Sequence, residues 1–146
     1  MEFKKLTVED IIKYSRYFSE CNLHLSDYSA AFKVMWQGYY AEYFTEVEGC
    51  FVSKEYYQGH AYFYYPLSLN DDAAEDRALD AIEEYCRQNN MRLHYTCVPR
   101  EKLYKFAKRY GSELRINNKR RWRDYLYNAD DFVTFAGKKF SGQRNH

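Results

Sequence analysis

Hydrophobic and polar positions alternate most clearly between residues 39 and 68, where three strand-length runs are rich in tyrosine and phenylalanine. The runs cover residues 39–47, 50–57 and 60–68, and they are separated by the dipeptides Glu48-Gly49 and Gln58-Gly59. Short glycine-bearing connections of this kind join antiparallel strands in hairpins. The pattern therefore predicts a three-stranded meander. Residues 61–67 are apolar or aromatic throughout, so they are predicted to be the innermost run.

Helical spacing of apolar residues flanks this meander on both sides. Thr7 followed by Asp10 is typical of a helix start, and Asp71-Asp72 begins a second, strongly periodic pattern. The predicted helices cover residues 8–19, 29–36, 72–88 and 100–110, with a further helical pattern from residue 130. Shorter strands are predicted at residues 3–6 and 91–98, with one or two more between 114 and 127.

This order of elements is similar to that of the N-acetyltransferase-like (GNAT) fold, also called acyl-CoA N-acyltransferase-like. The predicted fold class is therefore α+β, with a mixed, mostly antiparallel sheet flanked by helices. A chain of 146 residues has the size of one domain, so residues 1–146 are predicted to form a single GNAT-like domain. Fold alone does not assign an activity.

The overall charge does not indicate which class of partner the protein binds. Lysine and arginine total 22 against 21 acidic residues, so any basic binding site has to be local. The sequence contains neither an apolar run long enough to span a membrane nor a signal peptide, and we expect a cytoplasmic protein. Its cysteines show no C-x-x-C spacing and its histidines no H-E-x-x-H spacing, so no metal site is expected.

The segment that would bind coenzyme A in a GNAT-like fold is unfavourable for an anion. In members that use acyl-CoA, the helix after the fourth strand begins with a glycine-rich loop whose backbone N–H groups hold the pyrophosphate. The corresponding residues 67–78, LSLNDDAAEDRA, contain no glycine and four carboxylates. We therefore expect at most weak binding of acetyl-CoA and no cofactor. Because no nucleophile motif is present either, no catalytic set is assigned.

The basic and aromatic segment NNKRRWRDYLY, residues 117–127, has two interpretations. Its arginines and Lys119 could contact phosphate while Trp122 stacks on a base. Alternatively, it is an edge strand protected from aggregation by its charges, with Trp122 turned inward. The near-neutral charge of the chain favours the edge strand.

The last twenty residues carry a more specific signal. The segment YNADDFVTFAGKKFSGQRNH, residues 127–146, resembles the pattern Y-x-x-x-D-L-x-x-L-x-G-K-K-x-x-x-x-R-N-H of a bacterial domain family. That family is shared with the C-terminal, aminoacyl-transferase region of phosphatidylglycerol lysyltransferases. The residues SDYS at 26–29, Trp36 and FYYPL at 63–67 are also similar to it.

The resemblance implies a tandem pair of GNAT-like domains, of which this chain is similar to the N-terminal half. It implies an acyl- or aminoacyl-transferase that is completed by a second domain, with aminoacyl-tRNA as a candidate donor. Substrate-binding candidates are Lys138, Lys139, Arg144, Asn145 and Trp122. The alternative is a non-catalytic interaction or scaffold domain in which Lys138 and Lys139 only solvate a connecting helix.

The apolar residues at the end of the chain lead to one more expectation. Phe132, Phe135, Ala136 and Phe140 repeat at helical spacing with no further apolar partner in the sequence. We therefore expect Phe135 and Phe140 to be partly exposed, or covered by a second domain or a second copy of the chain.

Overall fold

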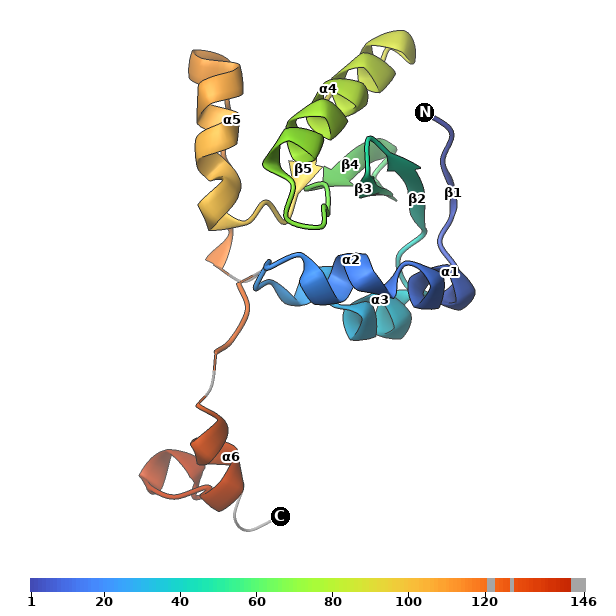
Figure 1. Cartoon of the computed structure of the whole chain (residues 1–146). Coiled ribbons are helices and arrows are strands. Elements are labelled where there is room, and N and C mark those ends of the chain that lie inside the picture. The colour runs from blue at the N-terminus through green and yellow to red at the C-terminus, as the bar shows by residue number, and fades with distance from the viewer. Residues whose placement is uncertain (121–122, 127, 143–146) are drawn as a thin grey trace. The chain divides into compact units, whose positions relative to one another are not determined.

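The computed structural model describes residues 1–120, 123–126 and 128–142, and it divides the chain into two compact units (Figure 1). Residues 1–115 form the first unit and residues 116–146 the second. The first unit contains a five-stranded sheet with the order β1-β2-β3-β4-β5. The strands are β1 (Lys4–Lys5), β2 (Glu42–Val47), β3 (Cys50–Tyr57), β4 (His60–Tyr64) and β5 (Tyr95–Thr96).

The predicted meander is confirmed, and its turns explain its register. Strands β2, β3 and β4 pair antiparallel, with Val47 opposite Cys50 and Tyr57 opposite His60. Both residues of each connecting turn have positive φ. The values are 53° for Glu48 and 73° for Gly49 in the first turn, and 49° for Gln58 and 78° for Gly59 in the second. Two positive φ values are what a type I′ hairpin turn requires, and its twist matches that of the strands.

The predicted strand at residues 91–98 is much shorter in the structure. Only Tyr95–Thr96 pairs, and it runs parallel to β4, with Phe63 opposite Tyr95. Cys97 has a φ of 49°, in the left-handed region that ends an extended strand. The segment 61–67 is almost wholly buried, as predicted. The middle strand of the sheet is nevertheless β3 and not β4, which this segment contains in part.

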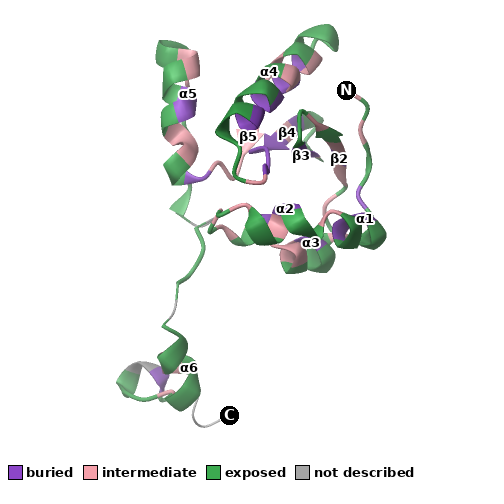
Figure 2. Cartoon of the chain, in the orientation of Figure 1, coloured by how far each residue is buried: buried purple, intermediate pink, exposed green. Residues whose placement is uncertain are grey.

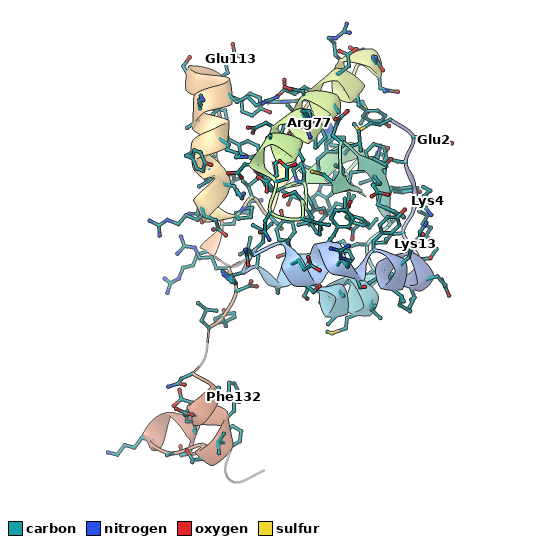
Figure 3. The ribbon with its side chains drawn as sticks, viewed as in Figure 1. Glu2, Lys4, Lys13, Arg77, Glu113 and Phe132 are labelled. Atoms are coloured by element: carbon teal, nitrogen blue, oxygen red, sulfur yellow. The ribbon has the colours of Figure 1, made fainter. Side chains whose placement is uncertain are left out.

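Helices cover both faces of the sheet in the first unit (Figure 1). The predicted helix at residues 8–19 is divided at Tyr14 into α1 (Val8–Lys13) and α2 (Ser15–Glu20), and it begins with the predicted capping box of Thr7 and Asp10. Lys4, labelled in Figure 3, reaches Asp10 Oδ1 at 2.6 Å. The segment then continues through η1 (Ser26–Tyr28) and α3 (Ala30–Trp36), which Ser29 caps.

The opposite face is covered by α4 (Asp72–Gln88), which has the predicted bounds. Figure 2 shows its buried residues along the side that faces the sheet. Ala74, Ala78, Ile82 and Cys86 pack with the even-numbered residues of β3 and the odd-numbered residues of β4, whereas Phe51 and Tyr64 belong to the second cluster, on the other face. The predicted helix at 100–110 is η2 (Arg100–Lys102) followed by α5 (Leu103–Tyr110), and η3 (Gly111–Glu113) ends the element.

A buried tyrosine hydroxyl links β4 to β5 beyond the end of their short ladder. Tyr28 Oη donates to the carbonyl oxygen of Cys97 at 2.8 Å and accepts from the N–H of Tyr65 at 3.0 Å. Tyr28 is 2% exposed, so both backbone groups are shielded from water by the same side chain that satisfies them. This hydroxyl therefore takes the place of a ladder hydrogen bond between the two strands.

The second unit corrects two predictions. Its described residues contain no strand between 114 and 126, so the edge-strand interpretation is wrong for 117–120 and 123–126. Ile116, Tyr125 and Leu126 are 62%, 81% and 92% exposed, so no sheet face covers this segment, and burial on a sheet is what stabilises an apolar strand. Trp122 and Tyr127 lie outside the described residues.

The predicted final helix also ends early. It is α6 (Ala129–Thr134), capped by Asn128, and it stops at Phe135, whose φ of 47° is left-handed. Gly137, with a φ of 92°, leads into η5 (Lys138–Phe140). Phe140 is only 8% exposed and its ring lies 5.8 Å from that of Phe135, so the expectation of an exposed Phe140 is wrong. The reversal of the chain at Phe135 folds the two rings together.

Taken together, the elements confirm the predicted fold class. The chain is α+β, with a mostly antiparallel five-stranded sheet flanked by helices, which is consistent with a GNAT-like fold.

Replacing Phe51 by alanine is expected to destabilise the protein by about 3–5 kcal/mol, the usual cost of deleting a buried phenylalanine ring. Phe51 is 1% exposed and its ring stacks on Phe44 with centroids 4.9 Å apart. Urea unfolding measures the free energy of unfolding. Tyr57→Ala, on the same strand but 54% exposed, is the control and is expected to change it by about 0.5 kcal/mol or less. Equal effects of the two variants would contradict this assignment of the core.

Replacing Tyr28 by phenylalanine is expected to cost about 2–6 kcal/mol, because two buried backbone groups lose their partner and each costs about 1–3 kcal/mol. The matched control is Tyr104→Phe, which removes a hydroxyl from a side chain that is 59% exposed. Thermal and urea unfolding of both variants provide the measurement. A Tyr28→Phe protein as stable as the wild type would mean that the hydroxyl does not bridge the strands.

Candidate functional site

The start of α4 is the place where a GNAT-like fold would hold the pyrophosphate of coenzyme A, and here the chain's own side chains occupy it. Asp71 caps the helix, with its Oδ1 accepting from the N–H of Ala74 at 2.9 Å. Ser68 Oγ accepts from the N–H of Asp71 at 3.1 Å. These contacts use backbone donors of the first turn that an anion would need.

Glu75 is the centre of the cluster. Its side chain is 7% exposed and accepts hydrogen bonds from Tyr65 Oη at 2.6 Å and Ser68 Oγ at 3.0 Å. Two lysines from the start of α5 complete its surroundings, with Lys102 Nζ at 2.7 Å and Lys105 Nζ at 3.0 Å from Glu75 Oε2. A buried carboxylate held by four donors is fully satisfied, so this network joins α4, α5 and the end of β4.

The two lysines are also engaged with neighbouring acids. Asp72 Oδ1 lies 3.1 Å from both Nζ atoms, and Asp76 Oδ1 lies 3.3 Å from Lys105. Hydrogen bonds from Lys102 and then Lys105 lower the pKa of Asp72 to about 2. Burial by itself would lower the pKa of Lys105, but its bonds to Glu75 and Asp72 outweigh that effect and raise it.

The electrostatics of this cluster disfavour a bound polyphosphate. Asp71, Asp72, Glu75 and Asp76 bring four negative charges to the helix start, and two lysines offset only half of them. A pyrophosphate would meet this net negative charge at a helix terminus whose dipole the acids already neutralise. In addition, a ligand entering between the ends of β4 and β5 would have to displace the hydroxyl of Tyr28.

The histidines do not form a metal site or a catalytic pair in the part of the chain that is described. His60 and His94 have ring centroids 5.7 Å apart, and His94 stacks on Tyr62 at 5.1 Å. His24 is exposed on a loop. Among the described residues, no group of three or more metal-ligating side chains is present.

The substrate-binding residues predicted from the sequence fall in the second unit. Lys138 is exposed in η5, while the side chain of Lys139 and the residues Trp122, Arg144 and Asn145 lie outside the described part of the chain. Their roles therefore stay predictions.

Lys102 and Lys105 were not among the predicted functional residues. Lys102 and Lys105 are three residues apart, which places them on one side of a helical segment. That this side faces the acidic residues 71–76 follows only from the folded structure.

Comparison with solved structures supports the fold. The chain is similar to a conserved protein of unknown function from Bacteroides thetaiotaomicron VPI-5482, with a TM-score of 0.83 and 20% sequence identity. The match covers 100% of this chain and 48% of that protein, so the chain spans about half its length. At this identity the likeness establishes the fold alone.

Two further findings concern membranes and sequence relatives. No helix in the described residues is both long enough and apolar enough to cross a bilayer. A search of curated proteins found no match.

The family comparison covers most of the chain. The model described as "Phosphatidylglycerol lysyltransferase, C-terminal" matches residues 18–146, which includes strands β2 to β5, α4, α5 and the whole second unit. The match extends far beyond the C-terminal pattern that first suggested the relationship. This chain therefore belongs to the phosphatidylglycerol lysyltransferase C-terminal family.

Proposed function

We propose that this chain is the N-terminal GNAT-like half of an acyl- or aminoacyl-transferase related to phosphatidylglycerol lysyltransferases. The observation that carries the proposal is the family match over residues 18–146. The similar solved structure supports a larger protein, because this chain accounts for 48% of its length. In this proposal a second GNAT-like domain completes the active site.

The start of α4 favours a donor other than acyl-CoA. Its backbone donors are used by Asp71 and its surroundings carry four carboxylates against two lysines. An aminoacyl-tRNA would supply an activated acyl ester without placing a pyrophosphate at this helix. Lys138, Lys139, Arg144 and Asn145, with Trp122, are proposed to contact the phosphates or the acceptor.

A non-catalytic interaction domain is the second candidate, and one surface favours it. An open, mostly apolar groove of about 490 Å³ lies between α1 and α3, lined by Ile11, Ile12, Ser15, Ala30, Ala31, Val34 and Met35. Ile12 and Met35 are 68% and 75% exposed. Exposed apolar surfaces of this kind often bind another protein surface, including a second copy of the same chain.

We also propose a cytoplasmic location, where aminoacyl-tRNA is available. All four cysteines are free thiols, which suits a reducing compartment.

Acetyl-CoA is expected to bind this chain no better than weakly, because of the repulsion at the start of α4. Isothermal titration calorimetry tests this prediction. A matched variant, Asp72→Asn with Asp76→Asn, removes two of the charges and leaves the buried Glu75 in place, so it should bind more tightly than the wild type. A micromolar dissociation constant for the wild-type chain would contradict the proposed exclusion of coenzyme A.

Transfer activity is tested with the full-length protein. It is incubated with aminoacyl-tRNAs carrying a radioactive amino acid and with vesicles containing phosphatidylglycerol, and labelled lipid is the expected product. Lys138→Glu together with Lys139→Glu should reduce transfer at least about tenfold, by analogy with the loss of several phosphate contacts. Lys108→Glu, an exposed charge reversal on α5, is the control. Absence of transfer to lipid and to peptide acceptors, together with specific capture of a protein, would favour the interaction domain.

A further inference from the structure

A row of polar and aromatic side chains crosses the sheet near the hairpin that joins β3 to β4. Glu42 on β2 stands directly opposite Glu55 on β3, and Glu55 stands opposite Tyr62 on β4. Tyr62 in turn stacks on His94, with ring centroids 5.1 Å apart and an interplanar angle of 19°. Directly opposed residues of neighbouring strands project from the same face, so these four side chains share one face of the sheet.

Two carboxylates opposed in this way need a compensating charge, and Lys33 on α3 forms a direct ion pair with Glu42. Lys33 Nζ lies 2.7 Å from Glu42 Oε1, and the side chains are 2% and 11% exposed. The same ammonium lies 3.8 Å from the centroid of the Tyr64 ring. The cluster thus contains one complete, buried ion pair supported by an aromatic face.

Among the residues that the structure describes, no cation contacts Glu55 directly. It accepts a hydrogen bond from Tyr64 Oη at 3.0 Å, which is a neutral donor. Burial raises the pKa of Glu55, and the carboxylates of Glu42 and Asp27 raise it further, against the lowering effects of Tyr64 and Lys33. His94 contributes little positive charge at neutral pH, because burial, Arg92 and His60 lower its pKa.

Aromatic residues neighbour Glu55 on its own face of the sheet, with Tyr62 opposite it on β4 and the Tyr64 hydroxyl bonded to it. Glu55, Tyr62 and His94 are each of intermediate exposure, whereas Tyr64 is 5% exposed. Tyr40, from the segment before β2, lies within electrostatic reach of Glu55, since Glu55 is among the groups that raise the pKa of its phenol after burial. A carboxylate beside aromatic ring faces is the combination that recognises an organic ammonium group.

We propose that Glu55, with Tyr62 opposite it on β4, binds a primary ammonium group of a small organic ligand. The ammonium group donates a hydrogen bond to the carboxylate of Glu55 and lies against the aromatic rings, as Lys33 does against Tyr64. Amino acids and their esters, and polyamines, carry this group. The proposal goes beyond the proposed function, because it requires neither transfer chemistry nor a second domain.

The test is a titration of the chain with n-butylammonium chloride, followed by the amide signals of β3 and β4 in nitrogen–proton NMR spectra. Sodium chloride at equal ionic strength and n-butanol are the reference titrations. Saturable shifts centred on Glu55 and Tyr62 are expected with the amine alone. Glu55→Gln should weaken the binding about tenfold or more, since the acceptor loses its negative charge, and Tyr62→Leu should weaken it about threefold.

Glu46→Gln is the matched control, because Glu46 is also a β2–β3 ladder glutamate that accepts a tyrosine hydroxyl, from Tyr17 at 2.8 Å. It should bind the amine as the wild type does. Equal affinity of the Glu55→Gln and wild-type chains would overturn the proposal, as would the absence of saturable shifts or equal shifts with sodium chloride. Since no tRNA, lipid or coenzyme is present, this outcome is independent of whether the full-length protein transfers an acyl group.

Discussion

The register between β2 and β3 is the constraint on which the rest of the first unit depends. It is fixed by a two-residue turn in which both Glu48 and Gly49 adopt positive φ, so that Val47 meets Cys50. A slip of one residue would move every side chain of a strand to the opposite face. With the observed register, Phe51 enters the core under α1 and α2, while Val52 enters the core under α4. The same register places Glu42 opposite Glu55.

The charged network at Glu75 connects this sheet to the helices that follow it. The buried carboxylate of Glu75 on α4 would be costly on its own, but two lysines and two hydroxyl groups satisfy it. The ion pairs of Lys102 and Lys105 with Glu75 hold α5 against α4. The same side chains lie at the start of α4, where an anionic cofactor would bind. Stability and the proposed exclusion of coenzyme A therefore have the same physical origin.

The elements that sequence analysis predicted well are those whose signal is local. The meander follows from alternation and two glycine-bearing turns, and α4 follows from strong 3.6-residue periodicity with an acidic first turn. The shortening of β5 depends on the backbone at Cys97, and the absence of strands in the described residues of 114–126 depends on the lack of a covering partner. The sequence does not show such tertiary conditions directly. The predicted contacts of Trp122, Arg144 and Asn145 stay predictions, because these residues lie outside the described part of the chain.

The buried lysines, whose ammonium groups lie against aromatic rings, were also not predicted from the sequence. Lys54, on the face opposite Lys33, is 2% exposed and donates to Tyr85 Oη at 2.8 Å. Its ammonium group also lies 4.1 Å from the ring centroid of Phe3 and 4.5 Å from that of Tyr85. Both lysines therefore use ring faces to offset part of the cost of burial. A periodicity argument assigns a strand lysine to solvent, because it cannot see the rings that surround it. Aromatic residues also neighbour the half-exposed Glu55, so this site suits an ammonium group of a bound ligand. The Glu55 carboxylate supplies a negative charge there, which the rings around Lys54 do not.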